Sequence, residues 1–372
     1  MFPYLIVFTV SIIVCFLYND RRKWIIIIPC LLLSLLAGFR DRGVGTDTLV
    51  YTDMYFSIAR HLNSLMDIVF YKSFEGGIDK GFLTLAWIAV QLSNNIWCFY
   101  FFIELVITLF SFAAILRLNK INKSNGIDIY IFAIIWIFLQ YNASYNAMRQ
   151  SCAMSIIMFA LSFALEKRWI LYGIWSFVAF LFHSTSLIAI VIPFIYFVSN
   201  VHSVKLRRVY LMLCVVGCIV VITAYSTILN YVNSIGILNK DYSAYDEGGR
   251  FEGGERLPYY DLLLIILQVA LILICYRRKM FTVQMLTFHR MILLIYFASL
   301  FLGLYNVYAA RIGMYFYAVS IIMWSIELSN RRISVSSLYY VTVSLVVFSW
   351  WYRIVYKNAH ETIPYTSSIL GL

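Results

Sequence analysis

The residues best suited to chemistry in this chain lie in one polar stretch, residues 38–51, directly after an apolar run. Its candidate site residues and turn-forming glycines are Arg40, Arg42, Gly43, Gly45, Asp47 and Tyr51. A guanidinium binds phosphate oxygens through two parallel hydrogen bonds, and glycine turns can direct backbone N–H groups at an anion. Asp47 is a candidate general base, unless it only orients the arginines. The stretch predicts an anion-binding site; the alternative is a set of Arg–Asp pairs at the level of the lipid headgroups.

Two other arginines stand at helix junctions. Arg149, followed by Gln150, opens a predicted helix after residues 141–148, and Arg311 ends the similar string 305–311. A cation at a helix N-terminus opposes the helix dipole, but an anionic ligand is stabilised by both. The two arginines therefore predict a shared phosphate pocket, with snorkelling to lipid phosphates as the alternative for Arg149.

One histidine has a setting that suits proton transfer. His183 lies between Phe182 and a run of hydroxyl side chains, at the predicted outer end of a helix. An imidazole can take a proton from a sugar hydroxyl near neutral pH, although a lone interfacial histidine is more often structural. The general base is thus left open between His183 and Asp47.

A second polar segment, residues 230–259, contains repeated Gly-Gly pairs among glutamates and arginines. Arg250 and Arg256 are candidate substrate-binding residues there. Glycine-rich loops of this length on a compact scaffold often carry function, so the segment predicts a mobile lid. A solvated connector is the alternative.

Composition sets the fold class. The chain is 62% hydrophobic and 13% charged, with a mean hydropathy of +0.82, which predicts an all-α polytopic membrane protein. We expect about twelve transmembrane helices in one integral membrane domain, residues 1–372, with two long extracytoplasmic loops at about 40–81 and 230–259. The short apolar run 81–92 predicts an interfacial or re-entrant helix. The predicted spans are residues 2–18, 24–39, 96–117, 128–145, 150–165, 169–183, 184–200, 209–229, 260–276, 288–304, 312–328 and 335–352.

The distribution of charge predicts the orientation. Placing all basic clusters in the cytoplasm satisfies the positive-inside rule and puts both termini and both long loops outside. The net charge of +11 is then an orientation signal with some attraction to anionic membrane lipids, and gives no reason to expect nucleic acid. The sequence has no Walker A, dinucleotide-binding or HExxH zinc motif. Its seven cysteines lie almost all in apolar runs, which favours core packing over a metal site.

The order of these motifs resembles one known family. Residues 38–47 with Tyr51, then Arg149-Gln150, Phe182-His183-Ser184 and residues 305–311 are similar to the EpsG family of Wzy-type polysaccharide polymerases. The resemblance covers about residues 30–330 and leaves out the second long loop, which in such polymerases varies with the sugar repeat.

The resemblance implies a multi-pass enzyme of the bacterial inner membrane whose active face is periplasmic. Such an O-antigen or exopolysaccharide polymerase would transfer the growing glycan from undecaprenyl diphosphate to the non-reducing end of a new lipid-linked repeat unit. It implies a GT-C-like glycosyltransferase without cofactor or metal, with a polysaccharide chain-length regulator as a partner.

The chemistry of that reaction assigns roles to the candidate residues. A lipid diphosphate leaving group needs positive charge, and the acceptor hydroxyl needs a base. The expected catalytic residues are His183, Asp47 and Arg149. The expected diphosphate- or substrate-binding residues are Arg40, Arg42, Arg311, Gln150, Tyr51, Arg250 and Arg256.

Other functions stay open on the sequence alone. A flippase for lipid-linked oligosaccharide would need polar residues along several spans, whereas these spans are nearly free of charge and the polar groups gather on one face. An O-antigen ligase would share the arginine and histidine chemistry but use another acceptor. An enzyme that modifies sugars or acyl groups on the outer face is a further alternative.

Overall fold

The computed structural model describes residues 1–71, 78–121, 126–234, 259–304, 310–334 and 336–372. Within these ranges the chain is helical and contains no strand. Elements marked η are 3₁₀ or π turns. In chain order the elements are α1 (Phe2–Phe16), η1 (Asp20–Ile26), α2 (Ile27–Gly38), η2 (Thr48–Thr52), α3 (Asp53–Arg60), α4 (Leu65–Phe70), α5 (Lys80–Ser93), α6 (Ile96–Ile121), α7 (Ile129–Trp136), η3 (Ile137–Tyr141), α8 (Asn142–Ser144), α9 (Met148–Leu165), α10 (Trp169–Phe182), η4 (Ser184–Ile190), α11 (Val191–Ser199), α12 (Val204–Thr223), α13 (Tyr225–Ser234), α14 (Tyr259–Arg277), α15 (Val283–Leu302), η6 (Arg311–Gly313), α17 (Met314–Leu328), α18 (Arg331–Ser334), α19 (Ser337–Trp350) and η7 (Trp351–Tyr356).

The apolar runs form the bundle that their length predicts. Within the described ranges, six helices are long and apolar enough to cross a membrane: α6, α9, α12, α14, α15 and α19 continued by η7. The other predicted spans are also helical, but they are shorter, as in α1 and α10, or interrupted by a π or 3₁₀ turn. The all-α membrane class is therefore confirmed, while the number of twelve spans and a GT-C-like arrangement stay predictions.

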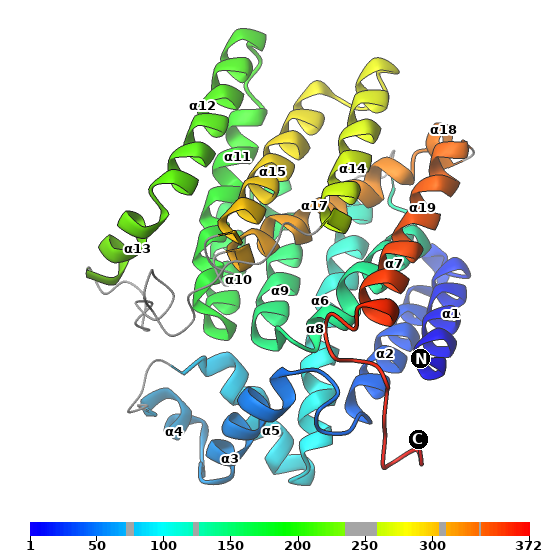
Figure 1. The fold of residues 1–372 in the computed structure, drawn as a ribbon, viewed down its shortest axis with the longest axis vertical. Helices are drawn as coiled ribbons and strands as arrows, with labels where there is room; N and C mark the ends of the chain where they lie inside the picture. The colour runs from blue at the N-terminus through cyan, green and yellow to red at the C-terminus, as the bar shows by residue number, and fades with distance from the viewer. Residues whose placement is uncertain (72–77, 122–125, 235–258, 305–309, 335) are drawn as a thin grey trace.

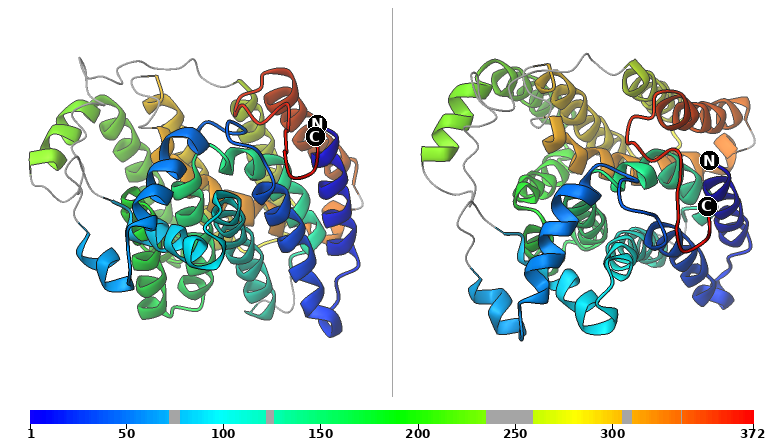
Figure 2. Two further views of the ribbon diagram at one scale, coloured as in Figure 1. Left: turned by 90° about the horizontal axis from the view of Figure 1, so that it is seen from below. Right: turned by 60° about the horizontal axis from the view of Figure 1, so that its bottom comes forward.

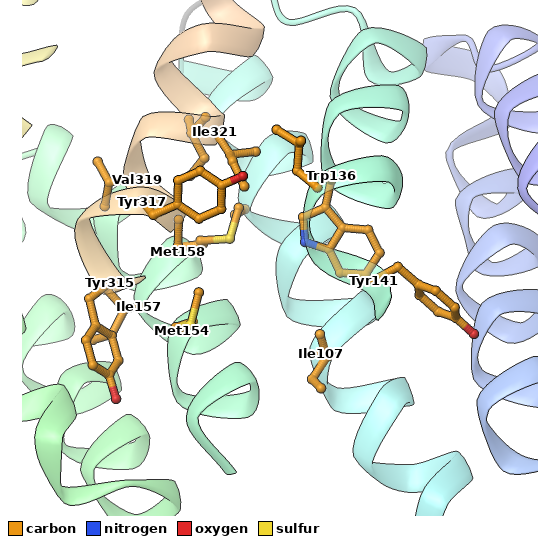
Figure 3. Packing of buried hydrophobic residues seen from close by; sticks show 14 of the residues in the cluster. Ile107, Trp136, Tyr141, Met154, Ile157, Met158, Tyr315, Tyr317, Val319 and Ile321 are labelled. Carbon is orange, nitrogen blue, oxygen red and sulfur yellow. The ribbon is translucent and has the colours of Figure 1, made fainter. Parts of the chain in front are cut away.

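Helix α9 occupies the centre of the bundle and α12 its edge (Figure 1). In the most apolar stretch of α9, 83% of the residues are buried, whereas the figure for α12 is 6%. Small residues such as Cys152, Ala153 and Ala160 line α9, and small side chains let membrane helices approach closely. Figure 3 shows Met154 and Met158 of α9 among side chains from its neighbouring helices.

Three short helices form a layer at one end of the bundle. Helices α3, α4 and α5 lie together there, below the long helices of Figure 1 and across their ends in Figure 2. The predicted short helix 81–92 is α5, which packs against α3 and α6. Ser64 begins α4 with a capping box to Asp67. In the chain, the layer comes directly after the polar stretch 38–51, so its helices lie next to the residues predicted to form the site.

The C-terminal tail, residues 357–372, returns across the first loop. The Asp41 backbone N–H donates to the Thr366 carbonyl at 3.0 Å, and the Gly45 N–H donates to the Glu361 carbonyl at 2.9 Å. The Tyr4 hydroxyl at the start of α1 donates to the Thr362 carbonyl at 3.0 Å. The first loop, the start of α1 and the tail therefore lie at one end of the molecule.

More polar groups are buried among the helices than their sparse charge suggests. Glu104 of α6 accepts a hydrogen bond from the Ser144 hydroxyl at 2.8 Å. His289 and Glu327 are fully buried, with 2.7 Å between the histidine Nδ1 and the glutamate Oε1. Buried ionisable groups are tolerated when they pair. The two clusters belong to the packing of α6 with α8 and of α15 with α17.

Candidate active site

The candidate site centres on a buried aspartate that three elements surround. The Arg149 Nη1 at the start of α9 donates to Asp79 Oδ2 at 2.6 Å. The His183 Nδ1, directly after α10, lies 3.9 Å from the same oxygen. The Asp79 side chain is 5% exposed and that of Arg149 13%. A largely desolvated cation, carboxylate and imidazole therefore meet at one point.

The close approach of α5 to α10 brings Asp79 to His183. Asp79 is the N-cap residue of α5, and Gly81 follows two positions later. A Cβ atom on Gly81 would lie 2.8 Å from the Phe182 ring and 3.1 Å from the Leu181 carbonyl carbon. Only a residue without a side chain fits this contact, so the Asp79-Lys80-Gly81 sequence fixes the distance between the carboxylate and the imidazole.

Two tyrosines flank the ion pair. The Arg149 guanidinium lies 4.0 Å from the centre of the Tyr51 ring and 5.8 Å from that of Tyr55. The Tyr55 hydroxyl donates to Asp79 Oδ2 at 3.4 Å and accepts from the Asp79 backbone N–H at 2.9 Å. Tyr51 belongs to the π turn η2, a rare geometry that is frequent at functional sites. The cation–π contacts hold the Arg149 guanidinium in place, and the Tyr55 hydroxyl holds the carboxylate that pairs with it.

Asp47 lies beside the start of α9. Its Oδ2 accepts the backbone N–H of Met148 at 3.3 Å. Burial raises the pKa of Asp47 from 3.8 to about 6, against the opposing charges of Arg149, Arg311 and Arg40. A carboxylate with a pKa in this range can both accept and return a proton near neutral pH.

The first loop needs glycine at position 45. Gly45 has a φ of +89°, and a Cβ there would lie 2.7 Å from Tyr145 Cβ and 2.9 Å from the Tyr145 carbonyl oxygen. Gly43 has a similar φ of +96°, but a Cβ on Gly43 would meet no atom within 4 Å. The two glycines thus share a backbone conformation and differ only in contact.

We expect Gly45→Ala to displace the loop from Tyr145 and to lower the activity of the site at least about tenfold, the size expected for misplacing a catalytic group by about 1 Å or less. Gly43→Ala should cost only the left-handed conformation, about 1–2 kcal/mol. Both effects can be measured by thermal unfolding in detergent and by the activity of the purified protein. Equal loss in the two variants would show that contact with Tyr145 is unimportant.

Arg40 is placed inside the protein. It is 1% exposed, and its guanidinium lies 3.9 Å from the centre of the Tyr145 ring and 4.7 Å from that of Tyr100. Its Nη1 donates to the Ala37 carbonyl at 2.9 Å. In this conformation Arg40 contributes positive charge behind Asp47 instead of presenting its guanidinium to a ligand at the surface.

The remaining predicted residues divide into three groups. Arg42 is exposed and pairs with Asp53, its Nε donating to Oδ1 at 3.2 Å. Gln150 Nε2 donates to the Arg311 carbonyl at 2.6 Å, which ties η6 to the start of α9. Arg250 and Arg256, with residues 235–258 of the predicted lid 230–259, lie outside the described residues, as does most of the string 305–311.

Asp79 is the main residue that sequence reasoning missed. It stands between a polar segment and a short apolar run, where a single aspartate looks like a helix cap. The available signal was its neighbour Gly81, since a glycine opening an apolar helix indicates a close contact. Among the described residues, no group of three histidine, cysteine or acidic side chains is placed to hold a metal ion.

The fold and the family comparison define the class of the protein. It is an all-helical membrane protein with a polar cluster at one end of its bundle. A family model described as the EpsG family matches residues 23–367, so the chain belongs to the EpsG family and is a polysaccharide polymerase-like membrane protein. This confirms the predicted family. Neither the comparison with curated proteins nor the comparison with solved structures gave a match.

Proposed function

We propose that this protein is a polysaccharide polymerase that acts on lipid-linked repeat units at the periplasmic face of the bacterial inner membrane. It transfers the growing glycan from undecaprenyl diphosphate to the non-reducing end of a new undecaprenyl-diphosphate-linked unit. The observation that carries the proposal is the meeting of Arg149, Asp79 and His183 in a chain of the EpsG family.

The proposed reaction needs one bond formed and one broken. The acceptor hydroxyl oxygen attacks the anomeric carbon of the growing glycan, and the bond from that carbon to the diphosphate oxygen breaks. The proton of the hydroxyl passes to a base, and undecaprenyl diphosphate leaves with the bonding electron pair. Positive charge already fixed beside the diphosphate lowers the barrier without reorganisation.

The distribution of charge around Arg149 suits this leaving group. Arg149 and Arg311 both act on the Asp47 carboxylate, so both guanidinium groups lie near the first loop. Asp79 holds Arg149 in one orientation between Tyr51 and Tyr55, and fixing charge in advance is what stabilises a transition state. The buried Arg40 adds to the positive potential around Asp47.

The base is Asp47 or His183. His183 lies 3.9 Å from Asp79, and a carboxylate beside an imidazole stabilises the protonated ring after it takes a proton. Asp47 has a raised pKa of about 6, which is close to the range that suits a general base. The pH dependence of variants at the two positions distinguishes them.

The glycan profile of a strain that lacks this gene tests the proposal. Loss of a polymerase leaves surface lipid carrying one repeat unit, and the gene restores the ladder of longer chains. Loss of an O-antigen ligase leaves no glycan on the surface lipid, and loss of a flippase halts the pathway before export. Either of the last two profiles would contradict the proposal.

A further inference from the structure

A cavity lined in part by Arg311 lies next to the start of α9. It has a volume of about 200 Å³ and is lined by η3, α8, α14, α15, η6, α17 and η7 with part of the C-terminal tail. The lining residues that matter here are Gln140, Asp261, Tyr296, Tyr317, Arg353 and His360. Pockets for drug-sized ligands typically measure about 300–1,000 Å³, so this cavity suits a group of the size of one sugar ring.

A buried amide in the cavity has no hydrogen-bond partner in the described part of the chain. Gln140 is 4% exposed, and both its Nε2 and its Oε1 lack a partner there. The Nε atom of Arg353 is also buried and unpartnered among the described residues. An unsatisfied buried polar group is destabilising, so such groups in native proteins indicate a ligand or ordered water.

The rest of the lining combines flat rings with a mixed set of charges. The Tyr296 and Tyr317 rings are 4.8 Å apart, and the Arg353 guanidinium lies 4.9 Å from the centre of the Tyr260 ring. Burial, together with the positive charges of Arg353 and Arg311, lowers the pKa of His360 to about 3. His360 is therefore neutral at physiological pH and can donate and accept hydrogen bonds.

This set of groups selects a ligand class. An apolar ligand would leave Gln140 and Arg353 unsatisfied, and a phosphate would meet the Asp261 carboxylate. A sugar ring offers hydroxyls that both donate to the carboxylate and accept from the amide and guanidinium, while its C–H faces pack on tyrosine rings. We propose that this cavity binds one sugar ring of the repeat unit and selects which repeat unit is polymerised.

The position of the cavity connects it to the proposed reaction. Arg311 lines the cavity, and Gln150 near the start of α9 holds the Arg311 carbonyl. The Asn146 Nδ2 lies 3.4 Å from His360 Nδ1, and the Asn146 Oδ1 accepts the Thr46 backbone N–H at 2.9 Å. Asn146 thus connects His360 in the cavity lining with Thr46, the residue before Asp47. The inference rests on the proposed function, because it makes this sugar part of the substrate.

Two of the turns that line the cavity are unusual. Gln140 belongs to the π turn η3 and Arg353 to the π turn η7. A π turn adds a residue to a helix and changes the direction of the side chains that follow. Both turns deliver a polar side chain to the same cavity, which favours recognition over packing.

Binding of free sugar to the purified full-length protein tests the inference. The probe is a set of oligosaccharides made by partial hydrolysis of the host's own surface polysaccharide, which lack lipid and diphosphate. We expect the wild type to bind them, by saturation-transfer NMR or titration of intrinsic fluorescence. Gln140→Leu should weaken binding roughly tenfold or more, since a site built to hydrogen-bond a ligand loses affinity when one partner is missing.

The melting temperature distinguishes a role of Gln140 in binding sugar from a role in holding the fold together. Because Gln140 has no hydrogen-bond partner among the described residues, Gln140→Leu should leave the melting temperature unchanged or raise it. The matched control is Gln268→Leu: Gln268 accepts from the Ser320 hydroxyl and lies 3.3 Å from His289 Nε2, so its loss should lower the melting temperature and leave sugar binding intact. If Gln140→Leu lowers the melting temperature and binds sugar normally, the cavity holds only water and the inference is wrong.

The same measurements distinguish failure of the inference from failure of the proposed function. Absence of sugar binding in the wild type, with a one-repeat glycan profile in the deletion strain, would overturn the cavity but not the polymerase. Sugar binding that Gln140→Leu abolishes, with a flippase or ligase profile, would retain the cavity as a sugar-binding site and overturn both the proposed function and the role of the cavity in polymerisation.

Discussion

Replacing Arg149 with alanine is expected to lower polymer synthesis by about 10²–10³-fold, the loss typical of removing one donor that stabilises transition-state charge. Arg149 is the guanidinium held by Asp79 and the Tyr51 ring, so its removal takes positive charge from the proposed diphosphate site. The measurement is turnover of lipid-linked repeat units by purified protein, with the chain-length ladder in complemented cells. Arg149→Lys keeps the charge and loses the planar fork, so it should fall between wild type and alanine.

The alanine variant also leaves the Asp79 carboxylate buried without its partner, which is itself destabilising. The double variant Arg149→Ala with Asp79→Asn removes both charges and should recover stability while staying inactive. Asp79→Asn alone should reduce activity because Arg149 loses its orientation. Full-length polymer from the stable double variant would rule out Arg149 as part of the reaction site.

A loss of activity below about pH 6, tenfold per pH unit, is the second expected result. If the Asp47 carboxylate takes the proton, the rate follows its ionised fraction, and burial raises the pKa of this group to about 6. Asp47→Asn should then lower the rate by about 10²–10⁴-fold and remove the acid limb. The profile is measured as kcat and kcat/KM against pH with purified protein.

The histidine alternative also predicts a loss of activity at low pH, because only a neutral imidazole can accept the proton. The variants distinguish them: if His183 is the base, the acid limb persists in Asp47→Asn and disappears in His183→Gln. Acid unfolding through Asp47 does not explain the limb. Its folded pKa lies above the ordinary value of 3.8, so between these values the folded state binds more protons and gains stability as the pH falls.

Helices and polar motifs were predictable from the sequence because each depends on local information. An apolar run of sufficient length forms a helix in a membrane whatever its neighbours are, so the segments around α6, α9 and α15 were placed correctly. Arg149, His183 and Asp47 were found because polar residues at the ends of apolar runs are conspicuous. Their proximity was inferred from topology alone; the contact that Arg149 and His183 both make with Asp79 supplies the physical cause for those two, and Asp47 lies beside them through its hydrogen bond with the Met148 backbone.

What depends on long-range contacts was not predictable. Arg40 occurs in a polar loop and reads as exposed, but the Tyr100 and Tyr145 rings enclose it. Asp79 acquires its meaning only when α5 meets α10 and α9. Arg353 lies near the end of an apolar run, and no local signal connects it with Gln140, more than 200 positions earlier in the chain. Tertiary packing decides all three.

Residues 357–372 lie across the first loop, and this arrangement has a consequence for the order in which the protein is assembled. The Asp41 side chain accepts the backbone N–H of Ser368, a residue 327 positions later in the chain, and Gly45 donates to Glu361. The ribosome makes residues 357–372 after all the helices that precede them, so the loop that holds Asp47 gains these hydrogen bonds only after those helices have been made. A chain that ends before residue 357 therefore leaves the first loop without its C-terminal hydrogen-bond partners.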